Sequence, residues 1–167
     1  EKHYPSEIEK VILLSLPYYH SPEEAKKAID SSRAFPGLFT DTKFAHASCM
    51  IVCALRPAFR FFVPFFFYKH LPRTIVADSF LHTHTSYFST LKEVVFHQNI
   101  PEIFRDINTS RITLVHGEND KTAPFVHIQE LVSEYSIQLE IVHDQEHLYP
   151  LAAPEETVKI IEKVLSE

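Results

Sequence analysis

Two residues with catalytic potential, Asp120 and His147, lie 27 positions apart in a pattern that would bring their side chains together. Asp120 follows the short apolar run 111–115 (RITLV), whose β-branched residues are typical of a buried strand. The segment 124–135 (PFVHIQELVSEY) has proline at a first-turn position and predicts a helix. A second strand is predicted over 138–142, and His147 comes just beyond it.

This order of strand, helix and strand places Asp120 and His147 at one edge of a sheet. Parallel strands joined by one crossover end on the same edge, where open α/β sheets bind their ligands. A carboxylate that holds one ring nitrogen of a histidine fixes its tautomer and leaves the other nitrogen to activate a nucleophile. The spacing therefore predicts two of the three members of a catalytic triad.

Three segments of the chain resemble α/β-hydrolases, in which the nucleophile, the acid and the histidine follow in that order. VHGENDKTAP resembles the acid loop, DQEHLYPLAAPEETVKIIEKVL the histidine loop and last helix, and HYPSEIEKVILLSLP the segment after the nucleophile helix. The resemblance covers residues 1–19 and 107–167. It implies an α/β fold, the C-terminal portion of an α/β-hydrolase parallel sheet with an inserted helical cap, and no cofactor. It also implies that His147 acts as base and then acid, and that Asp120 orients it.

We expect three regions along the chain. The run 11–16 (VILLSL) is a predicted strand, and Ser21 begins a helix because Pro22 and Glu24 complete a capping pattern. Apolar residues recur at helical spacing between Leu71 and Phe96. The expected division is a core strand segment at 1–19, a helical cap at 20–106, and a core segment at 107–167 carrying the acid and the histidine.

The nucleophile of a triad is not evident in this sequence. Its strained turn needs flanking glycines, and the two glycines, Gly37 and Gly117, flank no serine or cysteine in such a pattern. Ser15 is expected to be an ordinary serine at a strand end. Because the chain begins at Glu1 rather than methionine, we expect the nucleophile to lie upstream and this chain alone to be inactive. Its open sheet edge would pair with the missing segment or with a copy of itself, giving a homo-oligomer.

The longest apolar stretch is 49–67 (CMIVCALRPAFRFFVPFFF). Arginines in its middle are costly in a bilayer and prolines break it, so no transmembrane span is expected. An interfacial or pocket-lining pair of helices remains. Phe62, Phe65 and Phe66 are candidates for an acyl pocket, although the aromatic cluster could equally pack the cap against the core.

Other chemistries are disfavoured by composition. The net charge of −6 argues against a nucleic-acid surface. Cys49 and Cys53 are four positions apart in an apolar stretch and are expected to be packing residues. His82 and His84 point to different sides of a helix, and no metal-binding motif occurs, so no metal site is expected.

The expected function is hydrolysis of a small apolar carboxylic ester, in a cytoplasmic protein. Two alternatives stay open. One is a related enzyme that opens an epoxide or a carbon–halogen bond, because the unseen nucleophile decides the bond. The other is a non-catalytic binding or scaffold protein, which is favoured by the few glycines and by Glu146, where the family usually has glycine before the histidine.

Overall fold

The structure is a computed structural model that describes residues 8–31, 42–66 and 71–166. At its centre is a parallel three-stranded sheet, in the order β1 (Val11–Leu14), β2 (Ile112–Gly117) and β3 (Gln138–Val142). The sheet and its parallel connections are those predicted from the sequence, and β3 has the predicted bounds. β1 stops two residues earlier than expected, because Ser15 turns out of the strand with a φ of 49°.

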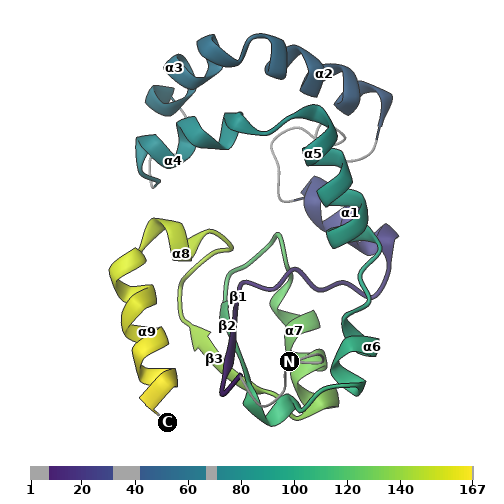
Figure 1. Cartoon of the computed structure of the whole chain (residues 1–167), viewed down its shortest axis with the longest axis vertical. Helices are drawn as coiled ribbons and strands as arrows, with labels where there is room; N and C mark the ends of the chain where they lie inside the picture. Colours follow the sequence, from purple (N-terminus) through teal and green to yellow (C-terminus); the bar gives the residue numbers. More distant parts are fainter. Residues whose placement is uncertain (1–7, 32–41, 67–70, 167) are drawn as a thin grey trace.

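Helices make up most of the rest of the chain (Figure 1). Between β1 and β2 they are α1 (Pro22–Ser31), α2 (Lys43–Ala54), α3 (Arg56–Phe66), α4 (Arg73–Asp78), the 3-10 turn η1 (Ser79–Leu81), α5 (His84–Thr90), the π-helical η2 (Leu91–Phe96), α6 (Ile100–Arg105) and η3 (Thr109–Arg111). After β2 they are α7 (Phe125–Tyr135), α8 (Tyr149–Ala152) and α9 (Pro154–Ser166). The described part of the long insertion is helical and holds no strand, although its limits as a domain stay a prediction.

The start of α1 shows how local sequence sets these helices. The amide of Glu24 donates to the Ser21 hydroxyl at 3.2 Å, which confirms half of the expected capping box. The Glu24 carboxylate accepts from the amide of His20 rather than from that of Ser21. Such a cap stabilises a helix by about 1 kcal/mol.

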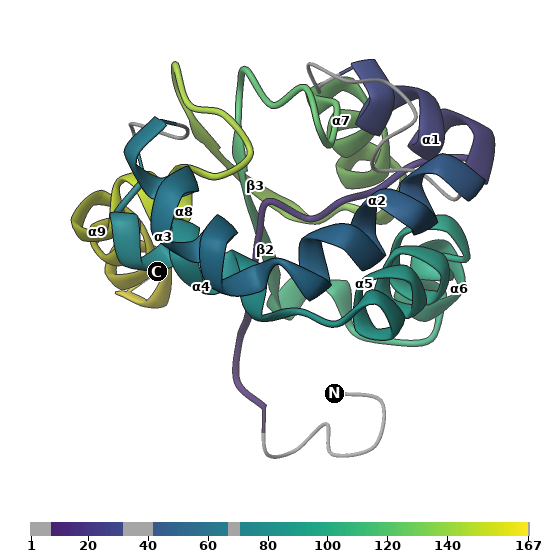
Figure 2. The same cartoon turned by 90° about the horizontal axis from the view of Figure 1, so that it is seen from above.

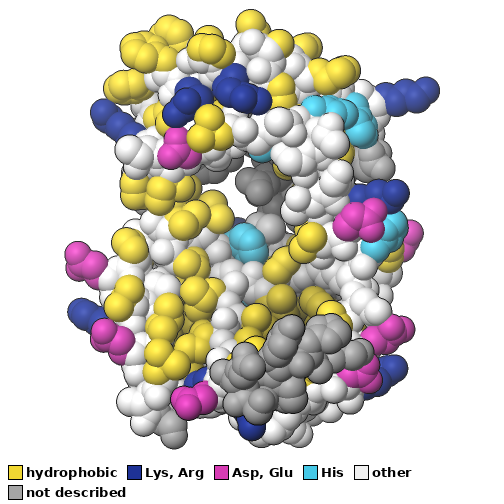
Figure 3. All heavy atoms as spheres, viewed as in Figure 1, with side chains coloured by type: hydrophobic (Ala, Val, Ile, Leu, Met, Phe, Trp, Pro, Cys, Tyr) yellow, Lys and Arg dark blue, Asp and Glu magenta, His cyan; other side chains and the backbone are white. Residues whose placement is uncertain are grey.

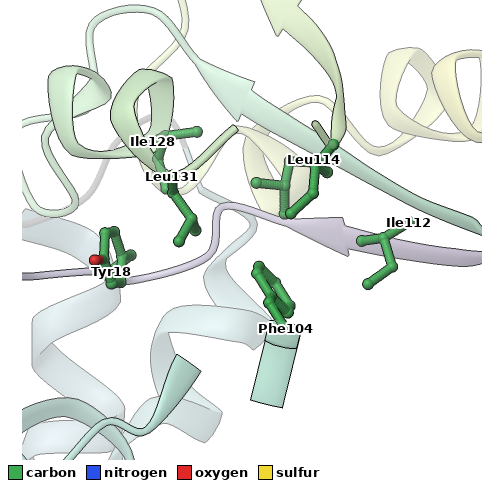
Figure 4. Packing of buried hydrophobic residues seen from close by; sticks show 7 residues of the cluster. Tyr18, Phe104, Ile112, Leu114, Ile128 and Leu131 are labelled. Atoms are coloured by element: carbon green, nitrogen blue, oxygen red, sulfur yellow. The ribbon is translucent and has the colours of Figure 1, made fainter. Parts of the chain in front are cut away.

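Two layers of helices bury the sheet. On one face α7 and α6 enclose a core of buried side chains (Figure 4), comprising Tyr18, Phe104, Ile112, Leu114, Ile128, Leu131 and Ile137. On the other face Val115, Val142 and Tyr149 pack against Ile160 of α9. Alternate residues of β2 therefore point into different cores, and all six of its residues are buried. β2 is the rigid support from which the acid loop begins.

Helices α2 to α5 form a separate layer above the edge at which the strands end (Figures 1 and 2). No single described helix is long and apolar enough to cross a membrane, and α2 and α3 reach that length only as a pair bent by 98°. The outer face of this layer is rich in exposed hydrophobic side chains interspersed with basic ones (Figure 3).

Candidate active site

The acid, Asp120, is held by the backbone of its own loop. β2 ends at Gly117, and the amide of Asp120 donates to the Gly117 carbonyl at 3.2 Å, which turns the loop back towards the strand end. The amides of Thr122 and Ala123 both donate to Oδ1 of Asp120 at 2.8 Å. The side chain of Asp120 has no exposed surface. Backbone donors of this kind fix the orientation of a carboxylate without any contribution from side-chain packing.

The second carboxylate oxygen of Asp120 faces the predicted histidine. Nδ1 of His147 lies 2.7 Å from Oδ2 of Asp120, and the predicted contact between the two residues is therefore confirmed. Because the carboxylate accepts a hydrogen bond from the Nδ1–H group, the neutral ring carries its lone pair on Nε2. The side chain of His147 is 25% exposed, and no hydrogen bond to Nε2 is found within the described residues. This arrangement presents an accessible base at the strand-end edge.

A second histidine, His116, also contacts Asp120. Nε2 of His116 is 2.9 Å from the Ala123 carbonyl and 3.3 Å from Oδ2 of Asp120. Its side chain is 1% exposed, and burial lowers the pKa of His116 below its usual value, with only partial compensation from the Ala123 carbonyl and the Asp120 charge. A neutral His116 donates from Nε2 and ties the end of β2 to the acid loop. No spacing in the sequence indicates this contact.

The acid and histidine loops approach one another at Gly117. A methyl group added at Gly117 would lie 2.5 Å from the carbonyl oxygen of Gln145 and 3.0 Å from that of Glu146. The amide of Asn119 donates to the same Gln145 oxygen at 2.9 Å, and the amide of Glu118 donates to Val142 at 3.0 Å. Only glycine fits at Gly117 without displacing the loop that carries His147.

Two buried tyrosines donate hydrogen bonds to backbone carbonyls next to the site. The Tyr149 hydroxyl donates to the Val115 carbonyl at 3.3 Å, and burial raises the pKa of Tyr149 to about 12, so the phenol keeps its proton. The Tyr19 hydroxyl donates to the carbonyl of Thr122 in the acid loop. These contacts connect the segment after β1 to the acid loop, and α8 to strand β2.

Ser15 is not joined to this pair. Its left-handed backbone is unusual for a non-glycine residue, but its amide simply continues the sheet by donating to Val115 at 2.9 Å. The Ser15 hydroxyl is buried beside the Tyr149 side chain. Among the described residues no hydrogen bond links this hydroxyl to His147, so the geometry agrees with a strand-end serine rather than a nucleophile.

The three candidate pocket residues lie apart from the core. Phe62, Phe65 and Phe66 are on α3, with side chains 56%, 54% and 69% exposed. Helix α3 contacts its neighbours α2, α4 and η1. Among the described residues these three side chains are therefore exposed rather than enclosed in an acyl pocket, and their role in substrate binding stays a prediction. Phe67 and Tyr68 of the same aromatic run, and Gly37, lie outside the described residues.

Comparisons with known proteins establish the fold. No family model matches the sequence, and no curated protein matches it. Two solved structures do resemble the chain: a bromoperoxidase from Bacillus anthracis has a TM-score of 0.60 over 96% of this chain, at 14% identity. An E-2-(acetamidomethylene)succinate hydrolase has a TM-score of 0.54 over 95%, also at 14% identity. The chain has the fold of the C-terminal part of an α/β-hydrolase.

The chain spans 59% of the length of the bromoperoxidase and 67% of that of the hydrolase. At this level of identity the likeness concerns the fold alone. The reaction must be argued from the chemistry of the site.

Proposed function

We propose that this chain supplies the acid and the histidine of a Ser-Asp-His triad in a hydrolase of apolar carboxylic esters. The observation that carries this proposal is the 2.7 Å contact between a fully buried Asp120 carboxylate and a partly exposed His147. Burial removes water that would compete for the carboxylate, while exposure leaves Nε2 of the histidine open to a reacting group. A purely structural pair would have no need of that asymmetry.

In the proposed reaction, Nε2 of His147 takes the hydroxyl proton of a serine as the serine oxygen attacks the ester carbonyl. The same nitrogen then returns the proton to the departing alcohol, and the cycle repeats with water. Asp120 holds Nδ1 and stabilises the imidazolium formed between these two transfers. The serine and the donors that stabilise the oxyanion would come from residues outside this chain.

The test uses a protein that contains this chain together with its preceding segment. Nitrophenyl esters of increasing acyl length are assayed with and without a serine-reactive phosphonate. His147→Ala should abolish phosphonate-sensitive turnover. The matched control is His143→Ala, which removes a histidine of the same loop whose side chain is 75% exposed and pairs with Glu118. Full activity of His147→Ala would overturn the proposal. Turnover that resists phosphonate would show that the nucleophile is not a serine, and would favour the alternative enzyme that opens an epoxide or a carbon–halogen bond.

We also propose that the free side of β1 pairs with the segment carrying that nucleophile. Within the described sheet β1 pairs with β2 alone and lies at an edge. Unpaired strand edges recruit further strands. The isolated chain should be inactive and should elute above monomer size, whereas adding the upstream segment should restore a single compact species. An active monomer of this chain would contradict the proposal.

A further inference from the structure

Three soft and borderline ligands converge within the helical layer, away from the Asp120–His147 pair. Cys49 and Cys53 are four positions apart on α2 and so share one face. His82 follows η1, 33 positions after Cys49, and the packing of the helices brings its ring to that face. The two sulfurs and a His82 ring nitrogen all lie within 4.8 Å of one another, and all three residues are partly buried.

The ring of His82 is oriented as it is in metal sites. Its Nδ1 donates to the backbone carbonyl of Ser79 at 2.7 Å, so the lone pair of the neutral ring is on Nε2. Nε2 faces Sγ of Cys49 at 3.9 Å. Histidines that bind metals commonly donate their other ring N–H to a carbonyl, which fixes both tautomer and orientation. The loop itself is fixed by Arg56, which donates to the His82 carbonyl at 3.0 Å.

We propose that Cys49, Cys53 and His82 bind one Zn²⁺, with water at the fourth position. Tetrahedral zinc with Zn–S near 2.3 Å and Zn–N near 2.0–2.1 Å requires sulfur and nitrogen about 3.6 Å apart. The 3.9 Å separation of Cys49 Sγ and His82 Nε2 is close to that spacing. As the two Zn–S bonds form, each thiol releases its proton to solvent, and the resulting centre is electrically neutral.

Such a centre would staple α2 to the turn between α4 and α5. No metal site is expected from the sequence, because His82 and His84 point to different sides of a helix, the two cysteines suit apolar packing and no metal-binding motif occurs. A second cluster, formed by His20, Glu24 and His127, also lies within 4.8 Å, but two of its three members are exposed. His20 is already engaged with Glu130 at 2.7 Å. This second cluster provides the control.

The test is a Co²⁺ titration of the purified chain followed by displacement with Zn²⁺. Thiolate ligands give a sulfur-to-cobalt charge-transfer absorption that nitrogen and oxygen ligands do not give. We expect one metal per chain, loss of that absorption in Cys49→Ser and Cys53→Ser, and at least about a tenfold weaker affinity in His82→Gln. His20→Gln should leave the titration unchanged.

The variant His82→Gln retains both thiols. Weaker metal binding in this variant therefore cannot come from a folding defect caused by replacing the cysteines. Zinc should also slow alkylation of the two cysteines in the wild-type chain and protect them less in His82→Gln. A titration unaltered by Cys49→Ser, or one abolished by His20→Gln, would overturn the proposal.

The outer face of α2 and α3 carries a group of exposed apolar side chains. Its large apolar side chains are more than half exposed, from 53% to 69%, and they are Phe44, Met50, Ile51, Leu55, Phe61, Phe62, Phe65 and Phe66. Figure 3 shows hydrophobic and basic side chains mixed over this part of the surface. The stretch 43–78 contains five lysines and arginines and one acidic residue, Asp78, which pairs with Arg60 at 3.1 Å, in a chain whose net charge is −6. Arg73 lies over the ring of Phe65 at 4.7 Å.

We infer that this face of α2 and α3 binds the surface of an anionic phospholipid bilayer. Helices that lie in a membrane interface combine bulky apolar side chains with flanking basic ones. Each basic residue near an anionic leaflet adds about 1 kcal/mol of attraction. A second copy of this chain suits the face less well, because the like charges of the two basic stretches would repel.

Vesicle sedimentation tests this inference. The chain should bind vesicles of phosphatidylcholine with phosphatidylserine, bind phosphatidylcholine alone more weakly, and dissociate as salt is raised. Phe62→Ser combined with Phe66→Ser should reduce binding at least about tenfold, since each substitution removes a large ring that would be buried in the bilayer. The matched control, Val158→Ser on α9, changes a residue that is 52% exposed and should bind as the wild type does. Equal binding to both vesicles, or self-association lost in the double variant, would overturn the inference.

Discussion

Replacing Gly117 by alanine should separate His147 from Asp120 without altering either side chain. The new methyl carbon would meet the Gln145 carbonyl oxygen at 2.5 Å, whereas ordinary contacts begin at 3.4 Å. The obstructing atoms are backbone, so the histidine loop must move by about 0.9 Å rather than rotate a side chain. Carried through to the ring, this movement would lengthen the 2.7 Å contact between Nδ1 and Oδ2 to about 3.6 Å, beyond hydrogen-bonding distance.

Two magnitudes follow from that displacement. Overpacking lowers the unfolding free energy by about 1–3 kcal/mol. Replacing glycine also restricts the unfolded chain, which raises the unfolding free energy by about 0.4–1 kcal/mol. The expected net loss of unfolding free energy is near 1–2 kcal/mol. A misplacement of about 1 Å at a reacting group costs on the order of 100-fold in rate. The stability change is measurable in this chain, and the rate change in a protein that includes the nucleophile segment.

The assay on the chain itself is the NMR signal of the Nδ1 proton of His147, which exchanges slowly with water while it is bonded to Asp120. Gly117→Ala should lose this signal. The matched control is Gln145→Ala, which changes the same loop but leaves the carbonyl oxygen that meets Gly117. A protected Nδ1 proton together with unchanged kcat/KM in Gly117→Ala would refute the idea that this close approach sets the geometry of the pair.

Three further substitutions test the neighbourhood of the site. Asp120→Asn should lower kcat by about 10⁴-fold in the complete protein, because the amide favours the wrong tautomer of His147, and a pH–rate profile will show the lost base. Because burial lowers the pKa of His116, the unfolded chain takes up a proton on this residue before the folded chain does. Unfolding free energy should therefore fall as pH drops below about 6.5, by at most about 1.36 kcal/mol per pH unit, and denaturant titrations should show a flatter dependence in His116→Gln. Ser15→Ala should leave turnover unchanged, because no hydrogen bond links this hydroxyl to His147 among the described residues; loss of turnover would identify Ser15 as the nucleophile.

The elements that carry the pair were predictable because they are coded locally. β3 (QLEIV) alternates polar and apolar residues before it ends at Val142, and its observed limits are those predicted. Once β2 and β3 are parallel neighbours, topology alone brings Asp120 and His147 to one edge. This inference needs no knowledge of side-chain packing, which explains why the contact could be derived from spacing.

The contacts that were not predictable depend on tertiary packing. His82 reaches Cys49 only because η1 packs against the helices of the insertion, and no periodicity in the sequence encodes that approach. His116 contacts Asp120 because a tight turn at Gly117 folds the loop back on the strand end. The exposure of Phe62 and Phe66 could not be predicted either, since the amphipathic pattern of a helix defines an apolar face but not the surface that covers it.

The hydrogen bonds that orient the Asp120 carboxylate come from the segment after the helical insertion. Oδ1 of Asp120 is held by two amides of its own loop, and Oδ2 by His147 and His116, all of which come from the segment after the insertion. The segment that precedes the insertion reaches this loop through the Tyr19 hydroxyl, which bonds a backbone carbonyl rather than the carboxylate. Changes in the helical layer, including metal binding at Cys49 or lipid binding at α3, should therefore alter access to His147 while leaving its hydrogen bond to Asp120 intact. Such changes would affect KM and acyl preference before they affect the pH dependence of kcat, whereas changes at Gly117 or His116 would affect the pair itself.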